Sequence, residues 1–290
     1  MSKIQWTDES WNPVIGCTKV SAGCKNCYAE RMAQRLYWMG MAKPATLPEY
    51  MSFEEGWKDG HIELCEHRLD KPLHWRKPRR IFVCSMSDLF HEKVPFEFIF
   101  KILAIIHLCP QHTFLILTKR PDKMGSIFVN IEPEDIIYQA RKIAYGRGVR
   151  LMNMAAVAAW PIYNLHLGVT CENQKTADER IPILLQIPAA VRFVSVEPML
   201  EPIDITKYLL PTFLSVDGHC WKPRPVWGIV GCESGPNRRE CKTEWVRDFV
   251  GQCQAANVPV FVKQLSINGK VEHDIHKFPK DLQVRQYPEN

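Results

Sequence analysis

Three cysteines near the start of the chain, Cys17, Cys24 and Cys27, have the residue type and the spacing to bind a metal centre. Six residues separate the first two and two separate the last pair. Gly16 and Gly23 each precede a cysteine, so the backbone is free to curl around a metal. A Cys-x-x-Cys turn that opens a helix also directs backbone N–H groups toward anionic sulfur.

Two kinds of centre compete for these thiols. Structural zinc prefers four protein ligands, and the next candidates, His61, Cys65 and His67, lie more than thirty residues further on. A [4Fe–4S] cluster has four irons to ligate, so three cysteines would leave one iron open to an exogenous ligand. We expect the cluster, and zinc completed by a distant residue is the alternative.

Short apolar runs rich in β-branched residues predict the strands that position this loop. They occupy 81–85, 113–118, 165–170, 191–196, 226–231 and 260–263, with a weaker run at 12–15. Helical patterns at 24–38, 95–108, 173–186 and 243–256 lie between them. This alternation predicts an α/β fold with a parallel sheet. Six or seven units favour a partial or complete TIM-like (β/α) barrel, and a doubly wound sheet is the alternative.

The length of 290 residues suits a single barrel domain over 1–290. Residues 40–77 and 131–160 fit the alternation poorly and are predicted insertions; 151–160 is read as a buried hairpin or helix, and 209–224 as a loop. The start of the chain lacks the pattern of a signal peptide, so the eleven cysteines are expected to be reduced and the protein cytoplasmic. No apolar stretch is long enough to predict a membrane span.

Polar residues follow each predicted strand, and in a parallel barrel these ends meet at the mouth where active sites form. They are Ser85, Ser87, Asp88, Thr118, Lys119, Arg120, Thr170, Glu172, Asn173, Gln174, Ser195, Glu197, Glu233, Ser234, Lys263 and Gln264. The catalytic candidates are Glu172, Glu197, Glu233, Lys119 and Cys232, the last as a hydrogen-atom donor. Thr118, Ser195 and Glu197 are also cofactor-binding candidates. The alternative is that a strand becomes polar where it leaves the core, and that Cys232 is simply a small buried residue.

A longer string of motifs carries a resemblance over nearly the whole chain. It reads Gly-Cys-x6-Cys-x2-Cys-Tyr-Ala, Phe-Val-Cys-Ser-Met-Ser-Asp-Leu-Phe, Leu-Thr-Lys-Arg-Pro, Gly-Val-Thr-Cys-Glu-Asn-Gln, Ser-Val-Glu-Pro-Met and Gly-Cys-Glu-Ser-Gly-Pro. This string resembles a phage- and prophage-associated three-cysteine family of unassigned chemistry. Through the cysteine loop it also resembles the radical S-adenosylmethionine superfamily, and distantly spore photoproduct lyase, although the common spacing there is three residues and then two.

The resemblance implies a cofactor pair. Cys17, Cys24 and Cys27 would ligate three irons, and S-adenosylmethionine would chelate the fourth through its amino and carboxylate groups. The residues that would contact S-adenosylmethionine are Tyr28 beside the adenine, Ser85, Ser87 and Asp88 in place of the usual Gly-Gly-Glu, and Thr170 and Glu172 at the ribose. An electron donor such as a ferredoxin or flavodoxin would drive reductive cleavage to a 5′-deoxyadenosyl radical, which abstracts a substrate hydrogen.

The substrate class is suggested by charge. The stretch 74–80 is basic and contains Trp75, which suits a phosphate backbone and a stacked base. The pairs 119–120 and 238–239 add charge, and the net charge is +5. The sequence leaves the substrate unidentified: a nucleic acid or nucleotide is one interpretation of these charges, and a solvated surface is the other. The alternatives are a zinc-stabilised, non-catalytic nucleic-acid-binding protein and a cluster protein for electron transfer or redox sensing.

Overall fold

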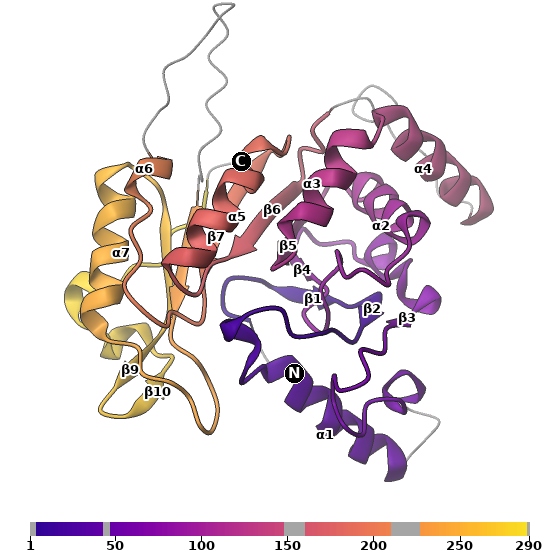
Figure 1. Cartoon of the computed structure of the whole chain (residues 1–290). Helices are drawn as coiled ribbons and strands as arrows, with labels where there is room; N and C mark the ends of the chain where they lie inside the picture. Colours follow the sequence, from indigo (N-terminus) through magenta and orange to yellow (C-terminus); the bar gives the residue numbers. More distant parts are fainter. Residues whose placement is uncertain (1–3, 43–46, 148–159, 210–226, 289–290) are drawn as a thin grey trace, which may run out of the picture. The chain divides into compact units, whose positions relative to one another are not determined.

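The computed structural model describes residues 4–42, 47–147, 160–209 and 227–288. They fall into two compact units, Met1–His166 with Pro188–Ala190, and Leu167–Ile187 with Val191–Asn290 (Figure 1). A single domain over 1–290 with two insertions stays a prediction. No helix in the described part of the chain is both long and apolar enough to cross a membrane.

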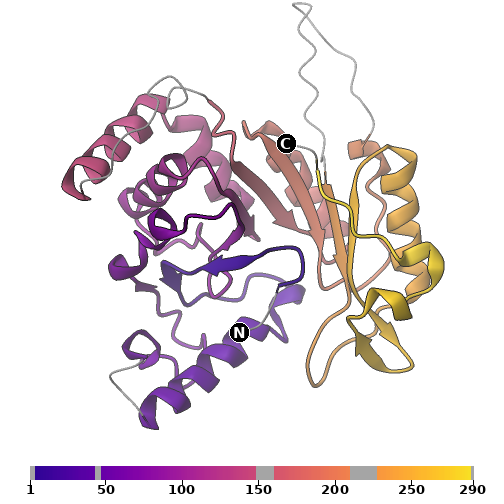
Figure 2. The same ribbon diagram turned by 180° about the vertical axis from the view of Figure 1, so that it is seen from behind.

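The first unit is built on three parallel strands in the order β1-β4-β5. These strands are Glu9–Trp11, Arg80–Val83 and Thr113–Thr118. The alignment of Trp11 with Val83, and of Val83 with Ile116, buries a continuous row of apolar side chains. Figures 1 and 2 show α2 and α4 on one side of these strands and α1 on the other. The helices of this unit are α1 (Tyr28–Ala42), α2 (Phe96–Leu108), α3 (Pro121–Asn130) and α4 (Pro133–Arg147).

The sequence predicts a strand of the parallel sheet at the weak run 12–15, and this prediction is wrong. The first parallel strand is β1, and the chain leaves it at Pro13, which has no N–H to donate to a neighbouring strand. Val14 and Ile15 then form β2, which pairs antiparallel with β3 (Glu63–Leu64). The carbonyl of Pro13 accepts a hydrogen bond from the N–H of Cys65 at 2.8 Å.

The predicted insertion at 40–77 contributes to the core of the first unit. Tyr50, Phe53 and Trp57 pack with Ile15 in one buried cluster, against which Cys17 and Cys27 also lie. The regular elements between β3 and β4 are short 3-10 helices at Glu66–Arg68 and Lys71–His74, and another, Pro48–Tyr50, precedes β3. The insertion is therefore the hydrophobic support beneath the cysteine loop.

The second unit carries the strand order β6-β7-β8-β9-β10, in which β7, β8 and β9 are parallel. The strands are β6 (Leu165–Thr170, of which 167–170 belong here), β7 (Val191–Val196), β8 (Trp227–Gly231), β9 (Val260–Ile267) and β10 (Lys270–Glu272). Its helices are α5 (Gln174–Gln186), α6 (Thr206–Leu209) and α7 (Thr243–Ala255). Short 3-10 helices follow at Ile275–Lys277 and Lys280–Leu282.

The last strand is longer than the predicted 260–263 and turns back into an antiparallel partner, β10. Asn268 and Gly269 both have positive φ, 49° and 71°, as a two-residue type I′ hairpin requires. The sheet is thus mostly rather than wholly parallel. An α/β fold with mostly parallel strands is confirmed.

The helix predicted at 24–38 begins later, at Tyr28, because a separate 3-10 turn, Ala22–Cys24, occupies the start of the predicted range. The predicted insertion at 131–160 contains α4 (Pro133–Arg147). The prediction of a hairpin or helix at 151–160 and that of a loop at 209–224 lie almost wholly outside the described residues.

Candidate functional site

The cysteine loop is fastened to the segment that follows β4. The N–H of Gly16 donates to the carbonyl of Met86 at 3.1 Å, and Ser87 Oγ donates to the carbonyl of Gly16 at 2.5 Å. Gly16 has φ +95°, and a Cβ there would lie 2.1 Å from the carbonyl oxygen of His61. Only glycine allows this approach, so Gly16 fixes the direction in which the chain runs from β2 into Cys17.

Arg120 ties the loop to the end of β5. Its guanidinium donates to the carbonyl of Thr18 at 3.1 Å, to Thr18 Oγ1 at 2.7 Å and to Cys17 Sγ at 3.6 Å. It also contacts Asp88 Oδ2 at 3.3 Å and Glu92 Oε1 at 3.0 Å. Burial opposes the charge of Arg120, yet the neighbouring Asp88, Cys17 and Glu92 raise its pKa, so it remains a cation.

Asp88 connects the segments that follow β4 and β5. Its carboxylate accepts from Thr118 Oγ1 at 2.7 Å and from the backbone N–H groups of Phe90 and Lys119, each at 3.0 Å. Asp88 is buried, and Arg120 lies against it. Asp88 and Thr118, both predicted to bind the cofactor, are joined to each other, and these contacts fix the base of the cysteine loop.

The three thiols differ in environment. Burial, with Asp88 adding to it, raises the pKa of Cys17 to about 12 despite the nearby Arg120. Cys17, Cys24 and Cys27 are all free and half-buried. Cys24 closes the 3-10 turn, and Cys27 precedes α1 with its carbonyl accepting the N–H of Arg31. The loop therefore presents three free thiols, and that of Cys17 lies against the Arg120 guanidinium.

A [4Fe–4S] cluster fits the donor set of this loop, though not its present arrangement. Three free, accessible thiols and a cation at Cys17 Sγ suit an anionic cluster. Among the described residues, however, no three His, Cys, Asp or Glu side chains are gathered closely enough to hold a metal ion. Loading would require the thiols to draw together.

The other predicted cofactor residues of this unit surround the same loop. Tyr28 hydroxyl donates to the carbonyl of Ser85 at 2.7 Å, which holds its ring, 37% exposed, beside the segment after β4. Ser85 Oγ donates to Asn12 Oδ1 at 3.1 Å. Lys119 contributes its backbone N–H to Asp88. Tyr28, Ser85, Ser87, Asp88 and Thr118 thus form one connected cluster with Cys17.

In the second unit each predicted carboxylate is paired with a cation. Glu172 is fully buried and accepts from Arg180 of α5 at 2.9 Å. Glu197 pairs with Lys263, and Glu233 pairs with Arg239. Each of these carboxylates is thus already engaged by a cation of the same unit. Arg180 also donates to the carbonyl of Thr170 at 2.7 Å, so it links two predicted ribose-binding residues.

Two further candidates in this unit are buried. Ser195 is fully buried, and its hydroxyl has no hydrogen-bond partner among the described residues. Burial raises the pKa of Cys232 to about 12, with Cys241 and Glu197 adding to the effect. Cys232 is therefore a neutral thiol at physiological pH, which suits a hydrogen-atom donor better than a nucleophile.

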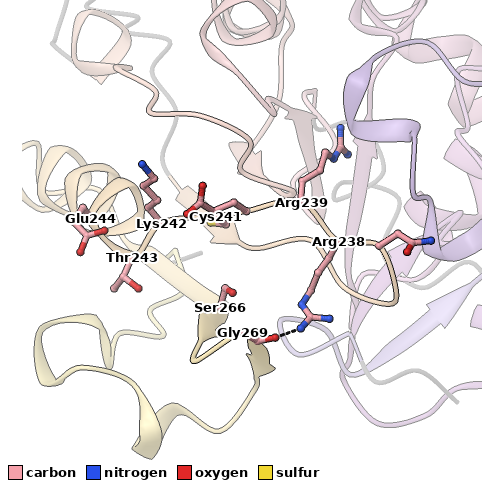
Figure 3. A pocket seen from close by; sticks show the side chains of 10 residues that line it. Arg238, Arg239, Cys241, Lys242, Thr243, Glu244, Ser266 and Gly269 are labelled. Carbon is pink, nitrogen blue, oxygen red and sulfur yellow. Dashed lines mark hydrogen bonds between the residues drawn. The ribbon is translucent and has the colours of Figure 1, made fainter.

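A polar cavity of about 820 Å³ opens in the second unit between the loop 237–242, the start of α7 and the β9–β10 hairpin (Figure 3). Arg238 donates to the carbonyls of Gly235 and Gly269. Arg239, also in the lining, is paired with Glu233. None of the residues predicted from the sequence to be catalytic or cofactor-binding lines this cavity.

The basic stretch 74–80 leads into the amino end of β4, whereas the cysteine loop is fastened beyond its carboxyl end. Arg79 pairs with Glu9, and Arg80 pairs with Asp8. Arg79 also lies over the ring of Trp75 at 5.4 Å. Arg76 and Lys77 lie between these residues and are exposed, and neither forms an ion pair with a residue in the described part of the chain.

Sequence reasoning missed the contacts that Thr18, Arg180 and Glu92 make. Arg120 was noted as charge near the expected site, but its bond to Cys17 was not anticipated. Except for the local pair Arg180–Glu172, these contacts join residues that are separated by 28 to 103 positions in the chain. Arg180 lies eight positions after Glu172, and its place two turns into a predicted helix was the available signal.

The chain belongs to the family described as "Protein of unknown function (DUF5131)", whose model matches residues 1–288. No curated protein and no solved structure matches it. Membership therefore gives the chain a family but no assigned chemistry.

Proposed function

We propose that this protein is a [4Fe–4S] enzyme that uses S-adenosylmethionine, on a partial (β/α) barrel in the cytoplasm, and that it acts on a nucleic acid or nucleotide. The single observation that carries the proposal is the loop of three free thiols fastened beyond β4, with the Arg120 guanidinium against Cys17 Sγ. The ten described cysteines are all free, which is what a reducing compartment favours.

The loop residues would hold the cluster. Cys17, Cys24 and Cys27 would each ligate one iron and leave the fourth for S-adenosylmethionine. The chemistry supplied when both are bound is reductive cleavage to a 5′-deoxyadenosyl radical, with the electron from a ferredoxin or flavodoxin.

The chain's own groups would position these partners. Arg120 offsets the negative charge near Cys17, and its bonds to Thr18 hold the loop in place. The Tyr28 ring, anchored by its hydroxyl to Ser85, offers an aromatic edge beside the loop. The oxygens of Asp88 are occupied by Thr118, Lys119 and Arg120, so Asp88 would act through the loop and not on the methionine amino group.

The test is anaerobic purification of the full chain, with iron and zinc analysis and visible absorption. We expect a brown protein with about four irons per chain and 5′-deoxyadenosine when S-adenosylmethionine and a strong reductant are added. Cys24→Ala should lose the iron, whereas Cys253→Ala, at a buried thiol of α7, should keep it.

Two results would contradict the proposal. A colourless protein with one zinc would favour the zinc-stabilised binding protein. A brown protein that never yields 5′-deoxyadenosine would favour electron transfer or redox sensing.

A further inference from the structure

Helix α1 begins at the residue after the third cysteine and carries a cationic and aromatic surface that the cysteine loop does not use. Arg31, Arg35, Trp38 and Met39 lie at helical spacings that place them on one side of the helix. We call these four residues the α1 outer face. Trp38 is 59% exposed and Met39 is 52% exposed, and Arg35 is also exposed. Large apolar side chains exposed together on a helix mark an interaction surface.

The charge of this face is of one sign. The acidic residue of α1 is Glu30, which lies on the other side of the helix. Lys19 pairs with it at 2.8 Å, and its Oε1 accepts the N–H of Trp57 at 3.3 Å. Arg35 makes no ion pair or hydrogen bond to any residue in the described part of the chain. A partner at this face would therefore meet the Arg35 guanidinium without a carboxylate already paired with it in the described chain.

Trp38 is held ready for stacking. Its ring meets the ring of Tyr37 edge to face, with centroids 5.0 Å apart. Tyr37 is buried, so it braces one edge of the indole while most of Trp38 remains open to solvent. A braced indole loses little conformational freedom when a planar group stacks on it.

We infer that the α1 outer face is a docking surface for single-stranded nucleic acid, with Arg31 and Arg35 at the phosphates and Trp38 beneath a base. Proteins bind single strands without reading their sequence by combining two contacts. Arginines pair with the phosphates of the backbone, and an aromatic ring stacks on any base. Arg31 and Trp38 are about 10 Å apart along the axis, enough to cover adjacent nucleotides. The inference rests on the proposed function only in taking the docked strand as the substrate.

The test is fluorescence anisotropy of the full chain with labelled single-stranded DNA and RNA of mixed sequence, about 20 nucleotides long, at several salt concentrations. Trp38→Ala should weaken binding about tenfold, and Trp38→Phe should restore most of it. Arg35→Gln should reduce the slope of log affinity against log salt by about 0.7, which is one phosphate contact on a single strand. Arg141→Gln, a matched change at an exposed arginine of α4, should leave affinity and slope unchanged. Arg76→Gln tests the basic stretch 74–80 in parallel.

Several outcomes overturn the inference. The unchanged protein binds no oligonucleotide, or Trp38→Ala does not weaken the binding. A third such outcome is binding that is lost in Arg76→Gln but kept in Trp38→Ala and Arg35→Gln. Tight binding to vesicles containing phosphatidylserine that also depends on Trp38, without oligonucleotide binding, would assign the face to a membrane surface.

The two proposals can fail separately. Oligonucleotide binding through Trp38 by a protein that holds no iron contradicts the cluster alone. An iron-loaded protein that generates 5′-deoxyadenosine but ignores Trp38→Ala contradicts the docking surface alone.

Discussion

Replacing Arg120 by glutamine should loosen the cysteine loop and lower the stability of the first unit. Arg120 and Asp88 form an ion pair whose side chains are only 6% and 8% exposed. Arg120→Gln would leave the Asp88 carboxylate buried without its cation, and it would remove the two bonds to Thr18. Both losses act on the segment that holds Cys17.

The magnitude follows from the surroundings of Asp88. Removing one partner of a buried ion pair costs about 3–5 kcal/mol. Asp88 would still accept from Thr118 and from the N–H groups of Phe90 and Lys119, so the lower end applies. Glu92 is 67% exposed and adds little. We expect the free energy of unfolding to fall by about 3 kcal/mol.

The assay is urea unfolding of the full chain followed by circular dichroism. Arg79→Gln is the matched control, because its ion pair with Glu9 is 35% and 31% exposed and should be worth less than about 1 kcal/mol. Iron bound after anaerobic reconstitution should also fall in Arg120→Gln. Equal, small effects of the two substitutions would refute the idea that Arg120 holds the loop.

Two further predictions use the thiols and a buried histidine. Iodoacetamide at neutral pH should label the half-buried Cys24 and Cys27 before Cys232, which is buried and has a pKa of about 12. Peptide mass spectrometry gives the order of labelling. Early labelling of Cys232 would contradict its burial. Burial lowers the pKa of His166 to about 4 from an unfolded value near 6.5. The unfolded chain therefore binds the proton first, and about 3 kcal/mol of stability present at neutral pH should be lost as pH falls through this window. The free energy of unfolding should fall less with decreasing pH in His166→Gln than in His276→Gln, a control at an exposed histidine. Equal decreases in the two variants would contradict the role of His166.

Much of the fold was readable from local pattern. The runs at 113–118, 165–170 and 191–196 coincide with β5, β6 and β7, because buried β-branched segments have few alternatives to a strand. The cap of α5 was also local: Asn173 and Thr176 exchange both bonds of a capping box. The weak run at 12–15 failed, because Pro13 ends the pairing of β1 with β4 and the following residues find β3 instead.

The sequence by itself determined which chemistry was available: three cysteines in one loop, and polar residues after each strand. Only the tertiary structure decided which of those polar groups meet. Asp88 and Thr118 bond to each other, and Arg120 reaches a sulfur 103 positions away. The reason is physical: hydrogen bonds and ion pairs depend on distances of a few ångströms between segments far apart in the chain, and residue spacing carries no measure of those distances.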